Sequence, residues 1–398
     1  MRLNRLNHLQ LRRRRSDRRR GAGLRDALVV LTLHYLATCL AADGAMSELD
    51  PAAPYGASIS DPVTHTVDFR VIVTPPYHCE LLKVWLPLPQ SDAGQTISDS
   101  RLSTFPMEVE PQVGAEPVYG NRFAYFEFHH PEGAQIIQHQ FTAVVSELQW
   151  HVNPAEVREV HEWPATFEPY LQPQSVEDQS ELDTVLQGIR EDRTGSARLL
   201  AAIDWVDANL EYDHVRASLR ADANHAFALR RGHCSDYHGL CATMGRALGS
   251  PTRVTYGLSL FPKNSPSHCK LEAFLPGYGW VSYDVSETQK LIAKIGARDD
   301  LSAEAKARLT ARTRERLHSG FRENSWLLLT KGTGYDLVPP ARRPVDVVRT
   351  IYAEADGVPL PDPDPANREL TSFSWMTAHR YVADRPFKKP FSDLSTLE

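Results

Sequence analysis

The chain has 398 residues, with 44 lysines and arginines, 50 aspartates and glutamates, and a formal net charge of −6 at pH 7. Without residues 1–42, 34 basic and 48 acidic residues remain, which gives a net charge of −14. An acidic chain with no basic face, aromatic-rich basic stripe or glycine-rich phosphate loop is not expected to bind nucleic acid.

The N-terminal segment has the composition of an export signal. Residues 1–26 contain ten arginines, no lysine and two acidic residues, and the apolar run 27–42 follows. This run is short for a membrane span, which takes about 20 apolar residues. We therefore expect residues 1–45 to be an export signal or lipoprotein-type signal. The protein is then expected to be exported, and periplasmic or associated with the cell envelope.

The processing of this segment stays open. Leu36-Ala37-Thr38-Cys39 resembles a bacterial lipoprotein box, although threonine before the cysteine is unusual, and the small residues up to Ala45 also suit ordinary cleavage. Arg18-Arg19 is compatible with twin-arginine export. A lipid on Cys39 would attach the protein to the membrane. The alternative without a signal is a basic arm that binds anionic surfaces, or a start codon assigned too early.

Residues 60–165 carry the patterns of β-strands. Apolar residues alternate with polar ones at Val67, Phe69, Val71 and Val73, and further extended segments follow at 84–86, 123–128 and 137–150. Short strands separated by Pro and Gly are typical of a sandwich. We predict an N-terminal β-sandwich-like domain that supports the core or recognises substrate.

A Pro- and Gln-containing connector, 164–180, leads to the next domain, 181–290. Its first clear helix is predicted over 196–210. The apolar residues of this helix recur on one face: Leu199, Leu200, Ile203, Val206 and Leu210. A short helix is expected over 226–230.

Cys234 is expected at a helix N-terminus. Gly232 interrupts the preceding segment, helix formers extend over 236–248, and Gly249 and Pro251 end the run. Unpaired N–H groups and the positive end of the helix dipole favour the thiolate, which is the nucleophilic form of cysteine. The same amides could receive the negative oxygen that forms when a thiolate attacks a carbonyl.

The next segment is predicted to be a hairpin. Two extended segments, 267–275 and 280–285, are joined by Pro276-Gly277-Tyr278-Gly279. This turn brings Asp284 within a few residues of His268 across the ladder. A carboxylate there could accept the imidazole N–H and stabilise the imidazolium. The sequence thus predicts Cys234, His268 and Asp284 as nucleophile, base and orienting acid.

These segments resemble the transglutaminase-like superfamily, whose papain-like core carries a Cys-His-Asp triad. The helix pattern of that family, G-x-C-x-D-[FY] followed by R-A-L-G-x-P-x-R, is matched by Gly232, Cys234, Asp236, Tyr237, Arg246, Ala247, Leu248, Gly249, Pro251 and Arg253. Its His and Asp strands with a P-G-x-G-W turn are matched by His268, Glu272, Pro276, Gly277, Gly279, Trp280 and Asp284. Two positions depart from the pattern, since Lys270 replaces a common aromatic residue and Val285 a common proline.

The resemblance implies an α+β fold, in which the helix bearing the cysteine packs on an antiparallel sheet bearing His and Asp, with the all-β domain before it. It implies no cofactor, and the calcium loop of some animal members has no recognisable counterpart here. An aromatic residue near the position of Tyr212 often lies by the nucleophile in this superfamily. Tyr212 is therefore a candidate for shaping the oxyanion site. Because Lys270 departs from the pattern, no substrate preference is carried over.

The remainder of the chain is predicted to be a charged helical insertion, 291–320, followed by C-terminal strands and a tail, 321–398, that complete the core. The helix over 302–318 has few apolar positions and is interpreted as a solvated surface helix, with a lid as the alternative. Strands are expected at 326–329 and 345–352. The last aromatic residues are expected to dock on the body: Phe373, Trp375, Tyr381 and Phe387.

Four cysteines follow the signal: Cys79, Cys234, Cys241 and Cys269. Cys234 and Cys241 would lie about 10 Å apart along one helix, beyond the roughly 7 Å limit for a disulfide. Cys269 follows His268 on a strand, so its side chain should point to the opposite face and pack in the core. A disulfide that involves Cys79 stays open.

The polar residues near Cys234 allow two further interpretations. Asp236, in the first turn of the helix, is expected to stabilise the helix N-terminus, and Arg253 could pair with it or with another core acid. His233 and His238 could join Cys234 and Cys269 in a metal site. Structural zinc sites usually bring paired, closely spaced ligands, which are missing here, so metal binding is the less favoured alternative.

The predicted function is that of a thiol acyltransferase or hydrolase that acts on carboxamide or peptide bonds through a thioester. Resolution by an amine would give cross-linking, and resolution by water would give deamidation or proteolysis. The expected partner is a protein or peptide substrate, and the sequence leaves both the acceptor and the oligomeric state open. The alternative is a catalytically inactive binding module of the same fold in the cell envelope.

Overall fold

The computed structural model describes residues 49–263, 265–363 and 374–397. The described residues form one compact unit. The predicted export signal at 1–45 and the docking of Phe373 lie outside the described residues. Among the helices that are described, none combines the length and the apolar character needed to cross a membrane.

The described strands form three antiparallel sheets and one short parallel pair. The first sheet has the order β12 (Phe321–Arg322), β6 (Gln135–Gln149), β1 (Ser58–Val73), β16 (Trp375–Ala383), with β3 (Gln95–Phe105) also on β6. The second has the order β15 (Val358–Pro359), β14 (Tyr352–Ala355), β2 (Leu81–Leu88), β5 (Arg122–His129), β4 (Gln112–Ala115). The third has the order β11 (Gly279–Tyr283), β10 (Ser267–Leu275), β9 (Thr252–Ser259), β13 (Trp326–Lys331). The parallel pair is β7 (Glu211–Tyr212) with β8 (Arg231–Gly232).

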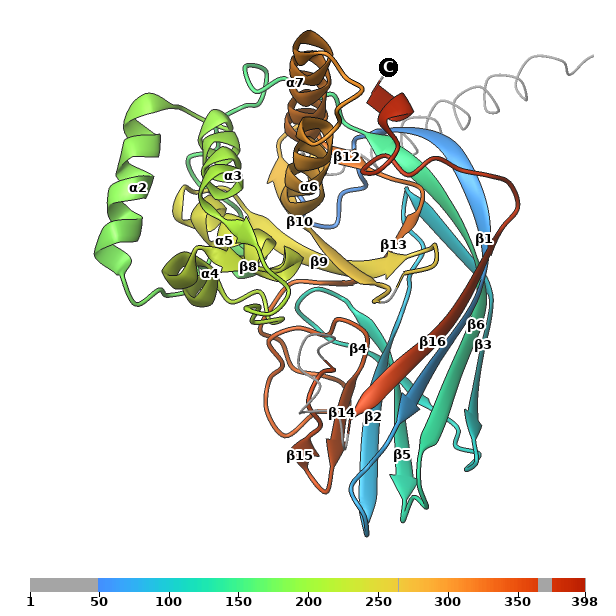
Figure 1. The fold of residues 1–398 in the computed structure, drawn as a ribbon. Helices are drawn as coiled ribbons and strands as arrows, with labels where there is room; N and C mark the ends of the chain where they lie inside the picture. Colours follow the sequence, from blue (N-terminus) through green and yellow to red (C-terminus); the bar gives the residue numbers. More distant parts are fainter. Residues whose placement is uncertain (1–48, 264, 364–373, 398) are drawn as a thin grey trace, which may run out of the picture. The chain divides into compact units, whose positions relative to one another are not determined.

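The helices gather around the third sheet, away from the long strands β1, β6 and β16 (Figure 1). They are α2 (Gln179–Asp192), α3 (Ala197–Asn209), α4 (Ala223–Leu229), α5 (Cys234–Ala247), α6 (Val285–Gly296) and α7 (Ala303–Ser319), with 3-10 turns at Ala165–Tyr170 and Leu394–Leu397. Mixed helices and antiparallel sheets make the fold α+β, as predicted. The predicted all-β region corresponds to the strands between residues 58 and 149.

An apolar core lies between the first two sheets. On β1 the residues Val67, Phe69, Val71 and Val73 are buried while their neighbours are more exposed, as period-two alternation predicts. They pack in one cluster with Val84 on β2 and Phe126 on β5. The burial of one face per sheet holds the two sheets together.

A second apolar core lies among the helices and the third sheet, and β9 contributes residues to both cores. Val254 and Tyr256 pack among the helices, whereas Leu258 and Leu260, further along the same face, pack with the first two sheets. The regions that the sequence separates at 164–180 therefore meet within one compact unit, and the domain boundaries stay a prediction.

The predicted strand at 345–352 is wrong. Val345 makes only an isolated bridge with Tyr335, and the buried Val345, Val348 and Ile351 recur every three residues instead of alternating. Among the described strands of the C-terminal part, β13 joins the third sheet, whereas β12, β14 and β16 pair with β6, β2 and β1 of the first two sheets. The assignment of residues 321–398 to one domain with the core stays a prediction.

Candidate active site

Cys234 is the first residue of α5. The observed helix thus begins two residues before the predicted run of helix formers, and Cys234 lies in its first turn. The Asp236 carboxylate accepts hydrogen bonds from the N–H of His233, at 2.9 Å, and from the N–H and hydroxyl of Ser218. A Cβ on Gly232 would lie 2.5 Å from Asp236, so a larger residue would disturb this contact. Asp236 thus fixes the start of the helix, in agreement with its expected structural role.

His268 and Asp284 meet across the predicted hairpin. β10 and β11 pair with Leu271 opposite Tyr283, so Asp284 lies just beyond the registered strand, near His268. The Nε2 atom of His268 lies 2.7 Å from Oδ2 of Asp284, and both side chains are buried. The hairpin therefore supplies the imidazole–carboxylate contact that the sequence predicts.

Asp284 is also the N-cap of α6, a helix that the sequence analysis missed. Its Oδ1 atom accepts a hydrogen bond from the N–H of Glu287 at 3.1 Å. One carboxylate oxygen therefore caps the helix while the other faces His268. The signal was present in the sequence, because Asp284 is followed by Glu287 and then by Leu291 and Ile295 at helical spacing.

The sulfur of Cys234 lies among several polar groups. Its Sγ is 3.1 Å from Nδ1 of His233, a contact that the sequence analysis missed although the two residues are adjacent. Burial would raise the pKa of the Cys234 thiol, but a hydrogen bond with Cys269 and the charges of His233 and His268 hold that pKa well below its ordinary value. The surroundings favour a thiolate.

His268 is surrounded by groups that stabilise its protonated form. Burial would lower its pKa, but the charges of Asp284 and Cys234, together with hydrogen bonds to both, raise the pKa of His268 to about 9. The charges of His268 and Lys270 in turn overcome burial and hold the pKa of Asp284 well below its usual range. The three predicted residues thus occupy one buried site, and their catalytic role stays a prediction.

Cys269 is buried in the apolar core, as predicted. Its sulfur also lies 3.5 Å from Nδ1 of His238, and its hydrogen bond with Cys234 helps to lower the pKa of the Cys234 thiol, so Cys269 belongs to the surroundings of the nucleophile. α5 packs against β10, which brings Cys234 and His238 close to Cys269. All four described cysteines are free, and no disulfide involves Cys79.

Tyr212, at the end of β7, lies near the nucleophile. Its ring centroid is 5.7 Å from that of His233, and Nζ of Lys290 lies 4.4 Å above the ring. Burial, followed by the charge of Cys234, raises the pKa of Tyr212, so its hydroxyl stays protonated. Its part in the oxyanion site stays a prediction.

His233, His238 and Cys269 are spread around Cys234. His233 contacts the sulfur, while Nε2 of His238 accepts a hydrogen bond from the N–H of Val285 at 3.1 Å. Within residues 49–263, 265–363 and 374–397, no three His, Cys, Asp or Glu side chains are grouped as metal ligands.

A cavity of about 200 Å³ opens beside His268. Its wall includes Glu287 and Lys290 from α6 and residues 389–392 from the C-terminal segment. This segment is held in place by the Arg316 guanidinium, which donates to the carbonyl of Pro390 at 2.7 Å. The C-terminal segment is thus part of the wall of the site.

Phe391 closes one side of this cavity, and its replacement by alanine is expected to open it. The ring centroid of Phe391 lies 4.9 Å from Nζ of Lys270 and 5.0 Å from Cζ of Arg316. In F391A, alkylation of Cys234 by a bulky maleimide should rise several-fold relative to alkylation by iodoacetamide. Peptide mass spectrometry measures both rates.

The matched control is F387A, because Phe387 lies on the same segment but packs on His65, with ring centroids 5.4 Å apart. In F387A, the ratio of the maleimide rate to the iodoacetamide rate should equal that of the wild type. Equal ratios in all three proteins would show that Phe391 does not limit access to Cys234.

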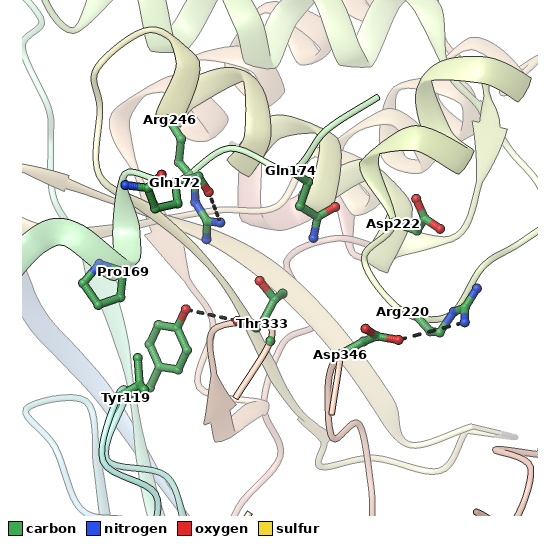
Figure 2. A pocket seen from close by; sticks show the side chains of 11 residues that line it. Tyr119, Pro169, Gln172, Gln174, Arg220, Asp222, Arg246, Thr333 and Asp346 are labelled. Atoms are coloured by element: carbon green, nitrogen blue, oxygen red, sulfur yellow. Dashed lines mark hydrogen bonds and ion pairs between the residues drawn. The ribbon is translucent and has the colours of Figure 1, made fainter. Parts of the chain in front are cut away.

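A second pocket of about 580 Å³ holds none of the three predicted residues. Figure 2 shows Arg220 facing Asp346 and the guanidinium of Arg246 beside Gln172. The ion pair of Arg220 with Asp346 measures 3.9 Å. Arg246 donates a hydrogen bond of 3.0 Å to the backbone carbonyl of Gln172. The hydroxyl of Tyr119 likewise donates to the carbonyl of Thr333. These groups are largely paired with each other, and the pocket brings together no nucleophile and base.

Comparison with known proteins finds a family match within the core of the chain. Residues 183–285, from α2 to the start of α6, match the model of a family described as the transglutaminase-like superfamily. Residues 183–285 are therefore similar to the transglutaminase-like superfamily, in agreement with the resemblance seen in the sequence. The match supports a thiol-dependent enzyme as the general class.

A solved structure shows the same fold over most of the chain. A structure described as a candidate cysteine protease from Cytophaga hutchinsonii has a TM-score of 0.58 at 15% identity, and the match covers 85% of this chain and 96% of that chain. A weaker similarity, with a TM-score of 0.29 at 16% identity, covers 58% of this chain and 91% of the periplasmic domain of TgpA from Pseudomonas aeruginosa.

An uncharacterised protein from Haemophilus influenzae is 26% identical over 159 residues, which cover 34% of this chain. The match spans 41% of the length of that relative.

Proposed function

We propose that this protein is an exported cysteine-dependent acyltransferase or hydrolase that acts on carboxamide or peptide bonds of a protein or peptide substrate. Cys234 is the nucleophile, His268 the general base and acid, and Asp284 the residue that orients His268. The observation that carries the proposal is the contact of 2.7 Å between Nε2 of His268 and Oδ2 of Asp284. That contact leaves Nδ1 of His268 to exchange a proton with the thiol.

The first half of the reaction forms a thioester. The Cys234 thiolate attacks the carbonyl carbon, a C–S bond forms, and the carbonyl electron pair moves onto oxygen. N–H groups at the start of α5 favour this oxyanion. The imidazolium of His268 then donates its proton to the nitrogen as the C–N bond breaks, and ammonia or an amine leaves.

The second half resolves the thioester. His268, now neutral, takes a proton from water or an amine as that molecule attacks the carbonyl carbon. The C–S bond breaks and the thiolate is restored. Water gives deamidation or proteolysis, and an amine gives cross-linking; the proposal covers both outcomes.

The proposal predicts a thiolate at Cys234 at low pH that depends on His268. Iodoacetamide should alkylate Cys234 well below the ordinary thiol pKa of about 8.5, because the neighbouring charges lower the pKa of this thiol. In H268A this low-pH reaction should be lost. The rate is followed from pH 4 to 10 by peptide mass spectrometry.

H233A is the matched control, because His233 also contacts the sulfur, whereas the contact with Asp284 is made by His268. It should keep the low-pH reaction, though with a smaller rate. Loss in H233A alone would identify His233 as the partner of the thiol. Slow alkylation that is the same in all three proteins would favour the inactive binding module.

A further inference from the structure

Lys270 is buried beside Asp284. Its Nζ atom lies 2.6 Å from Oδ2 of Asp284 and 2.9 Å from Oε2 of Glu323. Leu271 pairs with Tyr283, so the next two residues, Lys270 and Asp284, lie opposite each other. His268 is on the same face of β10 as Lys270 and is the diagonal neighbour of Asp284. Lys270 and His268 therefore contact the same carboxylate oxygen.

The ammonium group of Lys270 has no access to water. The side chain is 0% exposed, and the rings of Trp326 and Phe391 lie 5.3 and 4.9 Å from Nζ. Charges in such surroundings interact strongly, because little solvent screens them. A buried ammonium also needs compensation, which Asp284 and Glu323 provide.

We propose that Lys270 is a positioning residue of this site, which fixes the Asp284 carboxylate and shares its negative charge with His268. Lys270 thereby limits how firmly Asp284 holds the proton of the His268 imidazolium. The inference rests on the proposed function, because it concerns the base in that reaction.

The sharing of charge has a chemical use. An imidazolium paired with an unshared buried carboxylate would hold its proton too firmly to donate it to the leaving nitrogen, since proton transfer is most efficient from a group whose pKa is near the working pH. Glu323 acts in the opposite direction, because it draws part of the charge of Lys270 away from Asp284.

Other charged or titratable groups also surround His268. The Oε1 atom of Glu287 lies 4.0 Å from Nδ1 of His268, and the ring of His238 has its centroid 6.5 Å away. Further groups come from the start of α5, from β10, from α6 and α7, and from the segments that line the cavity and the sulfur: Cys234, His233, Cys269, Lys290, Arg316, Lys263, Lys389 and Arg349. The variants below leave all of these unchanged.

The inference predicts that K270M and E323Q shift the pH dependence of Cys234 alkylation in opposite directions. Iodoacetate is an anion, so its reaction with Cys234 is favoured while His268 is charged, and the rate falls when the imidazolium loses its proton. We call this fall of the rate at high pH the alkaline limb of the pH profile. In K270M, the negative charge of Asp284 is no longer shared with Lys270 and acts on His268 alone, so the alkaline limb should move to higher pH by about one unit. In E323Q, the positive charge of Lys270 is no longer shared with Glu323 and acts fully on Asp284, so the alkaline limb should move to lower pH. Peptide mass spectrometry of Cys234 gives both profiles.

A Lys270 that only stabilises the fold would lower the stability of K270M without moving the limb. Limbs that coincide with the wild type, or that move in the same direction in both variants, overturn the inference while low-pH, His268-dependent alkylation keeps the proposed function intact. A wild type without that alkylation overturns both.

If K270M does not fold, K270M/E323Q removes the ion pair as a neutral unit. Its limb should still lie above that of the wild type, because Lys270 contacts Asp284 directly and Glu323 contacts it only through Lys270. A limb at or below the wild-type position in this variant contradicts the inference.

Discussion

Replacing Asp284 by asparagine is expected to slow the alkylation of Cys234 at about pH 6 by roughly 10- to 1000-fold, which corresponds to the one to three pKa units that an adjacent opposite charge contributes. Asp284 helps to raise the pKa of His268 to about 9, so His268 is charged at this pH in the wild type. Without that carboxylate, burial lowers the pKa of His268, and the thiolate loses its counter-charge. Alkylation by iodoacetamide measures the change.

D284A separates the two tasks of this residue. Asparagine is a good N-cap and should keep the hydrogen bond to Glu287, whereas alanine loses it. D284A should therefore slow alkylation as much as D284N and also unfold at lower urea, at a further cost of about 0.5–2 kcal/mol. Alkylation in D284N at the wild-type rate would show that His268 does not depend on this carboxylate.

Replacing Glu272 by glutamine is expected to lower the free energy of unfolding by about 3–5 kcal/mol, the cost of breaking a buried ion pair by removing one partner. Glu272 lies 2.6 Å from Arg253, and the two side chains are 0% and 5% exposed. The guanidinium is also packed 3.9 Å from the ring centroid of Trp280, so it cannot reach water without disturbing the hairpin. Urea unfolding measures the loss.

The control is E211Q, which makes the same change in an exposed ion pair. Glu211 lies 2.8 Å from Arg231, and the two side chains are 68% and 38% exposed. Exposed pairs contribute about 0–1 kcal/mol, so this variant should unfold close to the wild type. Equal losses in E272Q and E211Q would contradict the argument from burial.

Local pattern predicted much of the site. Alternation located β1, turn residues located the hairpin of β10 and β11, and Gly232 with Pro251 bounded α5, because each of these signals acts within a few residues. The hairpin also fixed the distance between His268 and Asp284. Contacts of this kind follow from the register alone.

The missed features depend on contacts between distant segments. Nothing local reveals that Lys270 meets Glu323, that Phe391 lies over Lys270, or that Cys269 faces Cys234. The strand predicted at 345–352 failed because apolar residues spaced by three were interpreted without knowledge of what they pack against. α6 was missed although its N-cap was visible in the sequence, since Asp284 was considered only as an orienting acid.

The pairing of β1 with β16 determines when the first sheet can form during synthesis. β1 comes from the start of the described chain and β16 from near its end, yet they are paired from His65–Ala383 to Val73–Trp375. The first sheet therefore cannot close, and residues 389–392 cannot reach the cavity, until residues 375–392 have been synthesised. A nascent chain that already contains Cys234 and His268 lacks that wall, so the cavity beside His268 forms only after the C-terminal segment has folded onto the rest of the protein.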